Sequence, residues 1–245
     1  MRIEITGIAG LPEVGPGDDL GLLLASALAG GTDPGDVLVV AHKIVSKAEG
    51  RIVRLADVEP SARAVELAAA HDKDPRAVEV VLRESAEVVR AERGVLISRT
   101  RHGFVCANAG VDASNAGDPD TLVLLPVDPD ASARRLRAAV PGRPAIVITD
   151  SFGRAWRHGQ VDVAIGLAGL NALEDWRGRP DAAGRVMRAT WLAGADMVAA
   201  AGDLVRTKDG GTPAALVRGL GRHVTEEDGP GAAPLLRGPD EDLFR

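Results

Sequence analysis

The chain contains several short, continuous runs of apolar residues, and these runs constrain its fold more than any other feature. A run of this kind between turn residues is typical of a strand buried on both faces of a sheet. We predict such strands at the start of 36–47 (DVLVV), at 121–128 (TLVLLPVD) and at 144–150 (PAIVITD), the last ending on Asp150. Further strands are expected at 1–7 and 213–219.

Other segments have helical spacing, and one has the pattern of a hairpin. Residues 94–110 alternate on either side of His102-Gly103, which predicts two strands joined by a turn. Helices are expected at 19–29 (capped by Asp18 or Asp19), within 64–90 including 75–90, at 130–140 and at 183–205. This mixture favours a mixed α/β (α+β) fold over a doubly wound parallel sheet. No internal boundary is visible, so we expect one unit over 1–245 with an irregular tail after 228.

Composition excludes several classes of protein. The 245 residues are 45% hydrophobic, which is enough for a large core, and the net charge of -6 gives no basic field for nucleic acid. Three Phe, three Trp and no Tyr offer few platforms for stacking bases. No stretch approaches the roughly 20 apolar residues of a membrane span, and no secretion signal is present. The single cysteine, Cys106, lies on an apolar strand and reads as a buried structural thiol. We expect a cytoplasmic protein that binds neither nucleic acid nor membrane.

The first candidate site is the segment 107–118, ANAGVDASNAGD, which directly follows a predicted strand. Asp112, Ser114 and Asn115 offer hard oxygen ligands for magnesium or manganese, and the small residues let a ligand approach the backbone. Such a composition also commonly forms an Asx-type surface turn. Both interpretations of this segment stay open at the level of sequence.

The second candidate site is the segment 148–166, ITDSFGRAWRHGQVDVAIG. Asp150 follows an apolar strand and Ser151 supplies a neighbouring hydroxyl, a combination that suits a metal acting on phosphate. Arg154 and Arg157 could bind phosphate or carboxylate groups in a bidentate manner. A solvated basic turn is the alternative. Two Asp-bearing loops support a metal site better than either one alone.

The third segment is AHKIVSKAEGR at 41–51. Lys43 and Lys47 are four residues apart, so on a helix they would share a face and could neutralise phosphates, or they could be ordinary surface charges. The chain has no GxxxxGK[ST] loop, no GxGxxG after a strand and no HExxH. A P-loop or Rossmann fold is therefore not expected.

Read together, these segments resemble one family. GLPEVGPGDDL, VVAHKIVSKAEGRIV, ANAGVDASN and VITDSFGRAWRHGQVDVAIG occur here in the order and spacing of the coenzyme F420-0:L-glutamate ligases (F420 γ-glutamyl ligases). The likeness runs from residue 3 to about residue 220. It implies a mixed α/β fold without a Walker loop and a likeness to a family whose members form intertwined homodimers. The alternative to one undivided unit is a pair of intertwined subdomains.

The resemblance also implies an activity, part of coenzyme F420 biosynthesis. The family spends GTP to attach L-glutamate to the terminal carboxylate of F420-0 through an acyl-phosphate, and then adds further γ-linked glutamates. It uses two Mg²⁺ or Mn²⁺ ions, with K⁺ assisting. Some relatives carry an additional C-terminal flavin-dependent reductase domain, and because this chain ends at Arg245 we expect none here.

Residue roles follow from the same resemblance. It implies that Asp112, Asp150 and Ser151 bind metal. It implies that the nucleotide is contacted by Leu11, Pro12, Glu13, Val14, His42, Lys43, Lys47 and Asn115. Our candidates for catalysis are Asp112, Asp150, Lys47 and Arg154, with Arg157 as a second arginine for the acidic substrate or the transferred phosphoryl group.

Two positions depart from the family pattern. His42 stands where many relatives have a small polar residue, and Arg206-Thr207-Lys208 replaces a Met-Gly-Gln or Met-Gly-Lys loop. A protonated Lys208 cannot bind metal, so we assign it to phosphate. Two alternatives follow: a non-catalytic paralogue that binds nucleotide or deazaflavin, and an amide ligase of the same chemistry acting on another acidic substrate.

Overall fold

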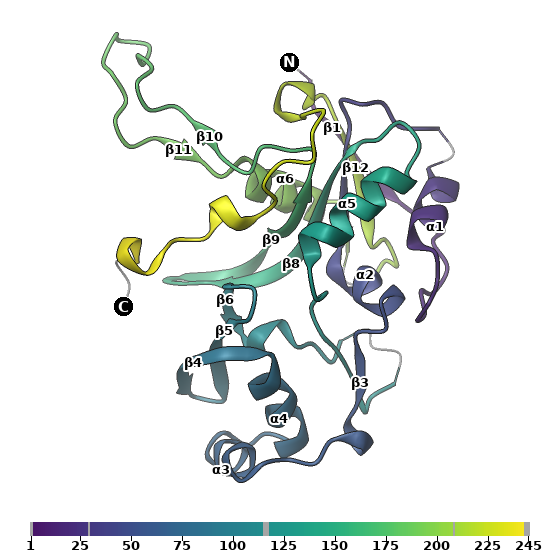
Figure 1. The fold of residues 1–245 in the computed structure, drawn as a ribbon, viewed down its shortest axis with the longest axis vertical. Coiled ribbons are helices and arrows are strands. Elements are labelled where there is room, and N and C mark those ends of the chain that lie inside the picture. The colour runs from purple at the N-terminus through teal and green to yellow at the C-terminus, as the bar shows by residue number, and fades with distance from the viewer. Residues whose placement is uncertain (1, 29, 115–117, 208, 243–245) are drawn as a thin grey trace.

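A mixed five-stranded sheet forms the centre of the upper part of the molecule (Figure 1). The computed structural model describes residues 2–28, 30–114, 118–207 and 209–242. The strand order is β1-β12-β2-β8-β9, in which β2 and β8 are parallel and the other neighbours antiparallel. The strands are β1 (Glu4–Ile8), β12 (Ala214–Arg218), β2 (Val37–Ala41), β8 (Ala145–Arg154) and β9 (Arg157–Ala168). The expected mixed α/β class is confirmed.

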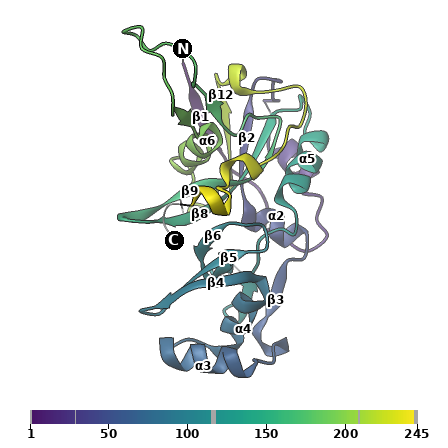
Figure 2. The ribbon, with the colours of Figure 1, turned by 60° about the vertical axis from the view of Figure 1, so that its left-hand side comes forward.

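Side chains of β8 alternate between two layers that cover this sheet. Ile146 and Ile148 pack in the core that includes residues of α1 (Leu20–Ala27) and α5 (Pro129–Ala139). Ala145 and Val147 pack in a second core with residues of α6 (Gly194–Asp203). Figure 2 shows α5 and α6 on opposite sides of the sheet. Because successive side chains of a strand point to opposite faces, the later residues of β8 continue this alternation between the α5 side and the α6 side of the sheet.

The lower part of the molecule has its own small cores. A three-stranded antiparallel sheet, with Leu96 fully buried in β5, packs against two helices (Figure 1). A two-stranded antiparallel pair, β3 with β7, lies beside them. These elements are β4 (Ser85–Glu92), β5 (Val95–Thr100), β6 (Val105–Ala107), α3 (Ala62–His71), α4 (Pro75–Glu84), β3 (Ile52–Arg54) and β7 (Thr121–Val123).

The remaining elements are short. Helix α2 (His42–Ala48) begins directly where β2 ends, and the pair β10 (Glu174–Asp175) and β11 (Trp191–Leu192) forms the base of a ribbon that projects from the body (Figure 1). Single 3-10 turns occur at Leu55–Asp57, Asn108–Gly110, Gly221–His223, Ala233–Leu235 and Pro239–Glu241. Among the described residues, no helix has the length and apolarity that crossing a membrane requires.

Several predicted elements are confirmed. The hairpin of 94–110 is present as β5 and β6, and β1, β2 and β12 lie where strands were expected. Asp19 caps α1 by accepting a hydrogen bond from the Leu22 amide. The described part of the tail after 228 contains only single 3-10 turns between irregular segments, as predicted.

Two helix predictions were too long. The segment 75–90 leaves the helix at Glu84, because the following residues pair with β5 as strand β4. The segment 183–205 is helical only from Gly194, because Trp191 pairs with Asp175 in the ribbon and the guanidinium of Arg177 lies 4.0 Å from the centre of the Trp191 ring. In both cases pairing with another strand outweighs local helix propensity.

Two strand predictions had wrong ends. The strand at 121–128 stops at Val123, since its partner β3 is only three residues long. The strand at 144–150 does not end on Asp150 but continues to Arg154, because β9 pairs with it along its whole length. Asp150 therefore lies inside a strand and not in a loop.

Candidate functional site

Asp150 and Ser151 are consecutive on β8 and have partners on opposite sides of the sheet. The Asp150 carboxylate continues the row of Ile146 and Ile148, and its Oδ1 lies 3.3 Å from Nε2 of His42 on α2. The Ser151 hydroxyl faces the α6 side and donates to Oδ1 of Asp162 on β9 at 2.6 Å. The two residues that sequence placed in one site thus face two different environments.

The Asp150 carboxylate is held in its ionised form. Burial by itself would raise the pKa of Asp150, but the charge of His42, a hydrogen bond from that ring and a hydrogen bond from the Ser151 amide lower the pKa below its usual value. His42 is only 2% exposed, and its Nδ1 lies 3.3 Å from the Ser46 hydroxyl oxygen. Its side chain therefore supports Asp150 from within the protein and does not face solvent, where a nucleotide would bind.

Asp112 takes part in an Asx-type turn and also presents a carboxylate oxygen to another element, so the two interpretations of segment 107–118 do not exclude each other. Its backbone bridges Val123 at the end of β7, and its Oδ1 accepts a hydrogen bond of 2.7 Å from the Ser114 amide, which forms the predicted turn. The other carboxylate oxygen, Oδ2, lies 2.6 Å from Nζ of Lys43, which also donates to the Ser114 hydroxyl at 2.5 Å. The turn thus presents a carboxylate to α2.

Asp112 is also held as an anion. Its partial burial would raise the pKa of the carboxyl, but the hydrogen bond from Lys43 and the hydrogen bond from the Ser114 amide lower the pKa below the usual range. The charge of Asp112 in turn raises the pKa of Asp150, so the two carboxylates lie within electrostatic range of each other. The first two residues of α2 thereby gather two acidic groups from distant segments of the chain.

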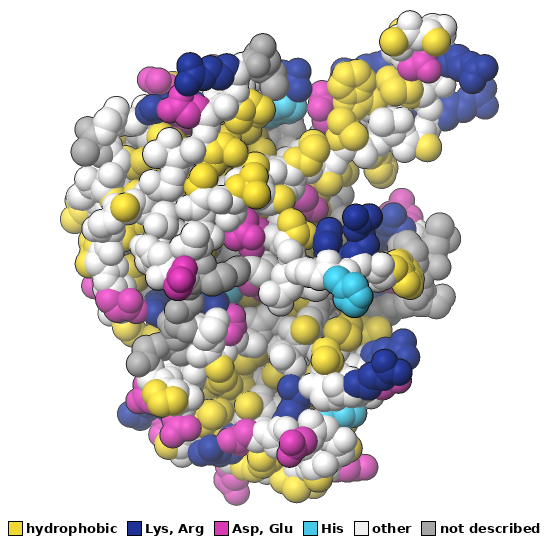
Figure 3. Space-filling view, turned by 180° about the vertical axis from the view of Figure 1, so that it is seen from behind, with side chains coloured by type: hydrophobic (Ala, Val, Ile, Leu, Met, Phe, Trp, Pro, Cys, Tyr) yellow, Lys and Arg dark blue, Asp and Glu magenta, His cyan; other side chains and the backbone are white. Residues whose placement is uncertain are grey.

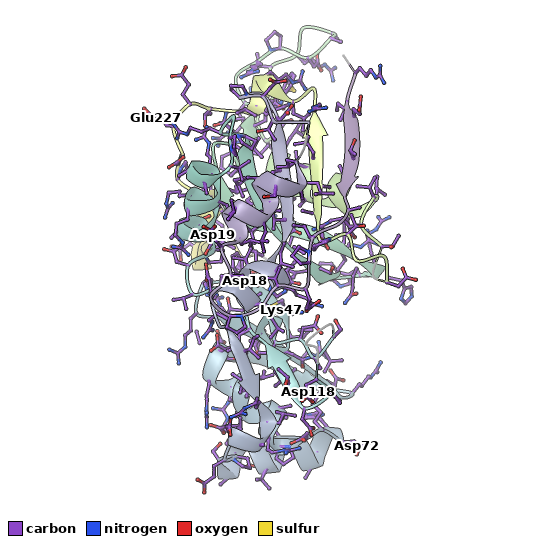
Figure 4. All side chains as sticks on the ribbon, turned by 90° about the vertical axis from the view of Figure 1, so that its right-hand side faces the viewer. Asp18, Asp19, Lys47, Asp72, Asp118 and Glu227 are labelled. Atoms are coloured by element: carbon purple, nitrogen blue, oxygen red, sulfur yellow. The ribbon has the colours of Figure 1, made fainter. Side chains whose placement is uncertain are left out.

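One turn further along α2, Lys47 contacts the loop that precedes α1. Its Nζ lies 2.5 Å from Oε1 of Glu13. Lys47 is only 7% exposed, whereas the Glu13 side chain is 80% exposed. The loop is anchored by Val14, which is buried, and by Leu11, which packs against the same core. Figure 4 places Lys47 at mid-height of the molecule, where the upper and lower parts meet.

On the other side of β8, sequence reasoning missed a buried acid. Asp162 is 4% exposed and accepts hydrogen bonds from Ser151 and, at 2.7 Å, from the Thr149 hydroxyl. Its Oδ2 also pairs with the guanidinium of Arg206, a residue noted from sequence only as a departure from the family. One signal was available: Asp162 is an acidic residue in the inward-facing row of a largely apolar strand.

The basic residues of the β8–β9 turn lie apart from the two carboxylates. Arg154 and Arg157 face each other at the tip of the hairpin, four or more residues beyond Asp150, which corresponds to about 13 Å along a strand. The guanidinium of Arg154 donates to the carbonyl of His158 at 2.5 Å and so closes its own turn. The structure does not bring Arg154 to Asp150.

Figure 3 shows the surface that bears this hairpin. Basic side chains gather on two projections along one edge of the molecule, one formed by the hairpin tip and one by the β10–β11 ribbon, with a notch between them. Two cavities lie elsewhere, one of about 510 Å³ beside Ser61, Glu79 and Arg83, and one of about 240 Å³ beside Asp18 and Glu49. Neither is lined by Asp112, Asp150 or Lys47.

The two carboxylates fit one kind of metal site. Within the described ranges, no three His, Cys, Asp or Glu side chains gather in a way that could hold a metal ion alone. Magnesium on phosphate substrates commonly takes one or two carboxylates and completes its shell with phosphate oxygens and water. Two ionised aspartates match that donor set. Asn115 and Lys208, which were also expected at the site, lie outside the described residues.

Cys106 behaves as the sequence predicted. It is buried on β6, and burial, followed by the charge of Asp150, raises the pKa of its thiol to about 12. The thiol therefore stays protonated at neutral pH, which suits a structural role and not a nucleophile.

Comparison with known proteins gives one consistent result. Residues 9–219 match the model of the F420-0:Gamma-glutamyl ligase family. A protein of Methanothermobacter thermautotrophicus named coenzyme F420:L-glutamate ligase is 45% identical over 253 residues, covering 100% of both chains. Proteins with the same name from Methanopyrus kandleri (46% identity, 95% of this chain, 94% of the relative) and Archaeoglobus fulgidus (42%, 100% and 97%) are similarly close.

Proposed function

Since this chain belongs to the F420-0:γ-glutamyl ligase family, we propose that it joins L-glutamate to coenzyme F420-0 at the expense of GTP. Relatives of this length and identity that are named for that reaction support the substrates. The structural observation that carries the proposal is the convergence of Asp112 and Asp150 on the start of α2. Further γ-linked additions would repeat the same reaction.

The proposed chemistry has two steps. An oxygen of the F420-0 carboxylate attacks the γ-phosphorus of GTP, the bond to the bridging oxygen breaks, and GDP leaves. The glutamate amine then attacks the carbonyl carbon of the acyl-phosphate, the amide bond forms, and inorganic phosphate leaves as the amine loses its proton. Phosphoryl transfer of this type depends mainly on positioning and on neutralising charge.

The residues of α2 suit that task. We assign Lys43 and Lys47 to the phosphates of GTP, with the loop Leu11–Val14 against the nucleotide. The Lys47 ammonium already holds one anion, the Glu13 carboxylate, so an incoming phosphate would take the place of that carboxylate. The His42 ring is assigned to Asp150 and no longer to the nucleotide, because it is buried against that carboxylate.

Asp112 and Asp150 would hold Mg²⁺ or Mn²⁺, and Ser151 would offer a hydroxyl oxygen to a second ion on the other side of β8. When bound, such ions neutralise and orient phosphate oxygens. Before any ion arrives, Lys43 balances the charge of Asp112, and the His42 ring lies against the Asp150 carboxylate. Potassium is retained in the proposal as an assisting ion. Lys208 and Asn115 are kept as nucleotide contacts.

Arg157, which is exposed on the hairpin tip, is our candidate for the acidic substrate. Arg154 is assigned to shaping that tip through its bond to the His158 carbonyl. We further propose that the protein is a homodimer, which sedimentation would show as a mass of twice 25.4 kDa.

Mass spectrometry of F420-0 after incubation with the protein, GTP, L-glutamate, Mn²⁺ and K⁺ tests the reaction. The expected product is heavier by one or more glutamyl units, and GDP release requires both acceptor and glutamate. Folded protein that binds GTP but releases no GDP would instead indicate a non-catalytic paralogue. GDP release with another acidic acceptor, and none with F420-0, would indicate an amide ligase of different specificity.

A further inference from the structure

A directed network of hydrogen bonds lies beneath Ser151 on the α6 side of β8. Arg206 donates from Nη2 to the Thr149 hydroxyl at 3.0 Å and to Asp162. Thr149 in turn donates to Oδ2 of Asp162 at 2.7 Å, while Ser151 donates to Oδ1 at 2.6 Å. Each donor in this network points at the same carboxylate.

The network is built by the register of the hairpin. Ser151 and Asp162 are directly opposed across β8 and β9, and Thr149 lies two residues before Ser151, on the same face. Arg206 follows α6 and is 7% exposed, so its charge is balanced within the protein by Asp162. A buried ion pair of this kind costs desolvation energy, which the hydrogen bonds of Nη2 offset in part, since Nε and Nη1 of Arg206 have no hydrogen-bond partner among the described residues.

We propose that Asp162 is a positioning residue that fixes the direction of the Ser151 hydroxyl. A carboxylate paired with a guanidinium only accepts hydrogen bonds, so it takes the Ser151 hydrogen. The Ser151 oxygen can then act toward a cation only as an electron-pair donor. This inference rests on the proposed function, in which Ser151 contributes an oxygen to a divalent cation.

The same geometry gives the Arg206 loop a role. Without Arg206, Oδ2 of Asp162 would lose its guanidinium partner and keep only the hydrogen bond from the Thr149 hydroxyl among the described contacts. Arg206 therefore fixes Oδ2 of Asp162 from one side and leaves Oδ1 directed at the Ser151 hydroxyl. Outer groups of this type typically change metal affinity by 10- to 100-fold when they are replaced.

Asp162→Asn is the most informative variant, because it keeps the size of the side chain and leaves one acceptor oxygen where Asp162 uses two. Arg206 and Thr149 would take that oxygen, and the amide NH₂ would then face Ser151. The Ser151 oxygen would have to accept this hydrogen bond, with its own hydrogen turned toward the cation. Asp162→Ala is less useful, since it would leave Arg206 buried without a partner.

Mn²⁺ alone is the probe, titrated into the folded full-length protein and followed by the electron paramagnetic resonance of the free ion. Ser151→Ala should raise the Kd of one Mn²⁺ site, and Asp162→Asn should raise the Kd of the same site by roughly 10-fold or more. Because the two residues act together, the double variant should be no weaker than the weaker single variant. Ser151→Thr keeps the hydroxyl and should retain the affinity.

Asp196→Asn is the matched control. Asp196 lies on α6, accepts a hydrogen bond of 2.9 Å from the Ala164 amide on the same side of the sheet, and has no contact with Ser151 among those described. This variant should leave the Kd unchanged. An unchanged Kd in Asp162→Asn or in Ser151→Ala, or additive losses in the double variant, would overturn the inference. Glutamylation of F420-0 by the unaltered protein tests the proposed function separately.

Discussion

The ammonium of Lys43 and the carboxylate of Asp112 form an ion pair of 2.6 Å that joins helix α2 to the turn after β6. The pair links two segments about 70 residues apart in the chain and lies at the surface, with both side chains partly exposed. It is therefore worth about 1 kcal/mol or less to the free energy of unfolding at neutral pH. Its contribution should show mainly as pH dependence.

In the Lys43→Met variant, the free energy of unfolding should fall less steeply as the pH is lowered than it does in the unaltered protein. The pKa of Asp112 in the folded protein is lower than in the unfolded chain, so the pair stabilises the fold above about pH 4 and this stabilisation disappears as the pH falls through the folded value. Urea unfolding at pH 7, 5, 4 and 3 measures the effect. An unaltered slope of free energy against pH in the variant would contradict the assignment.

Asp150→Ala should abolish the proposed ligation without unfolding the protein. We expect kcat/KM for F420-0 to fall by at least about 10³-fold, which corresponds to about 4 kcal/mol of transition-state stabilisation. Circular dichroism should report an intact fold. Glu66→Ala, at an exposed position of α3, is the control and should keep full activity. Near-normal turnover of the Asp150 variant would remove the basis for a metal site here.

Cys106 should resist thiol reagents. Since the pKa of its buried thiol is about 12, only a minute fraction is thiolate at pH 8. Labelling with a chromogenic disulfide should be slow in the native protein and become rapid in guanidinium chloride. Rapid labelling of the native protein would show that β6 is more open than its burial indicates.

Gly166→Ala should destabilise the fold by about 1–3 kcal/mol. A Cβ at Gly166 would lie 2.5 Å from the carbonyl oxygen of Pro129, so β9 and α5 would have to separate. Gly153→Ala, on β8, is the control, because a Cβ there meets nothing within 4 Å. The control should change stability by no more than about 0.5 kcal/mol. Equal effects of the two substitutions on thermal unfolding would argue against this packing.

The sequence alone was sufficient where a local pattern decides the structure. The apolar runs of β2 and β8, the cap of α1 at Asp19 and the hairpin of β5 and β6 all follow from spacing and turn chemistry. The ends of β8 and of α4 were wrong, because each is decided by pairing between two strands that follow one another across a two-residue turn. Such pairing leaves no signal in the segment itself.

In the candidate site, too, the residue types could be identified from the sequence, whereas their contacts could not. Asp112 and Asp150 were identified from residue type and resemblance, yet their partners His42 and Lys43 could not be assigned without the fold. Asp162 was missed because a lone acid in an apolar strand reveals neither its depth nor its partner. Its pairing with Arg206 depends on how the segment after α6 returns to the sheet.

The alternation of side chains along β8 has a consequence for how this protein can vary. A substitution changes one side chain. Inserting or deleting a single residue between 145 and 149 would instead move every following side chain of the strand to the opposite face of the sheet. Asp150 would then face Asp162 and Arg206, and Ser151 would face His42. We therefore expect the length of this strand to be far less tolerant of change than its composition.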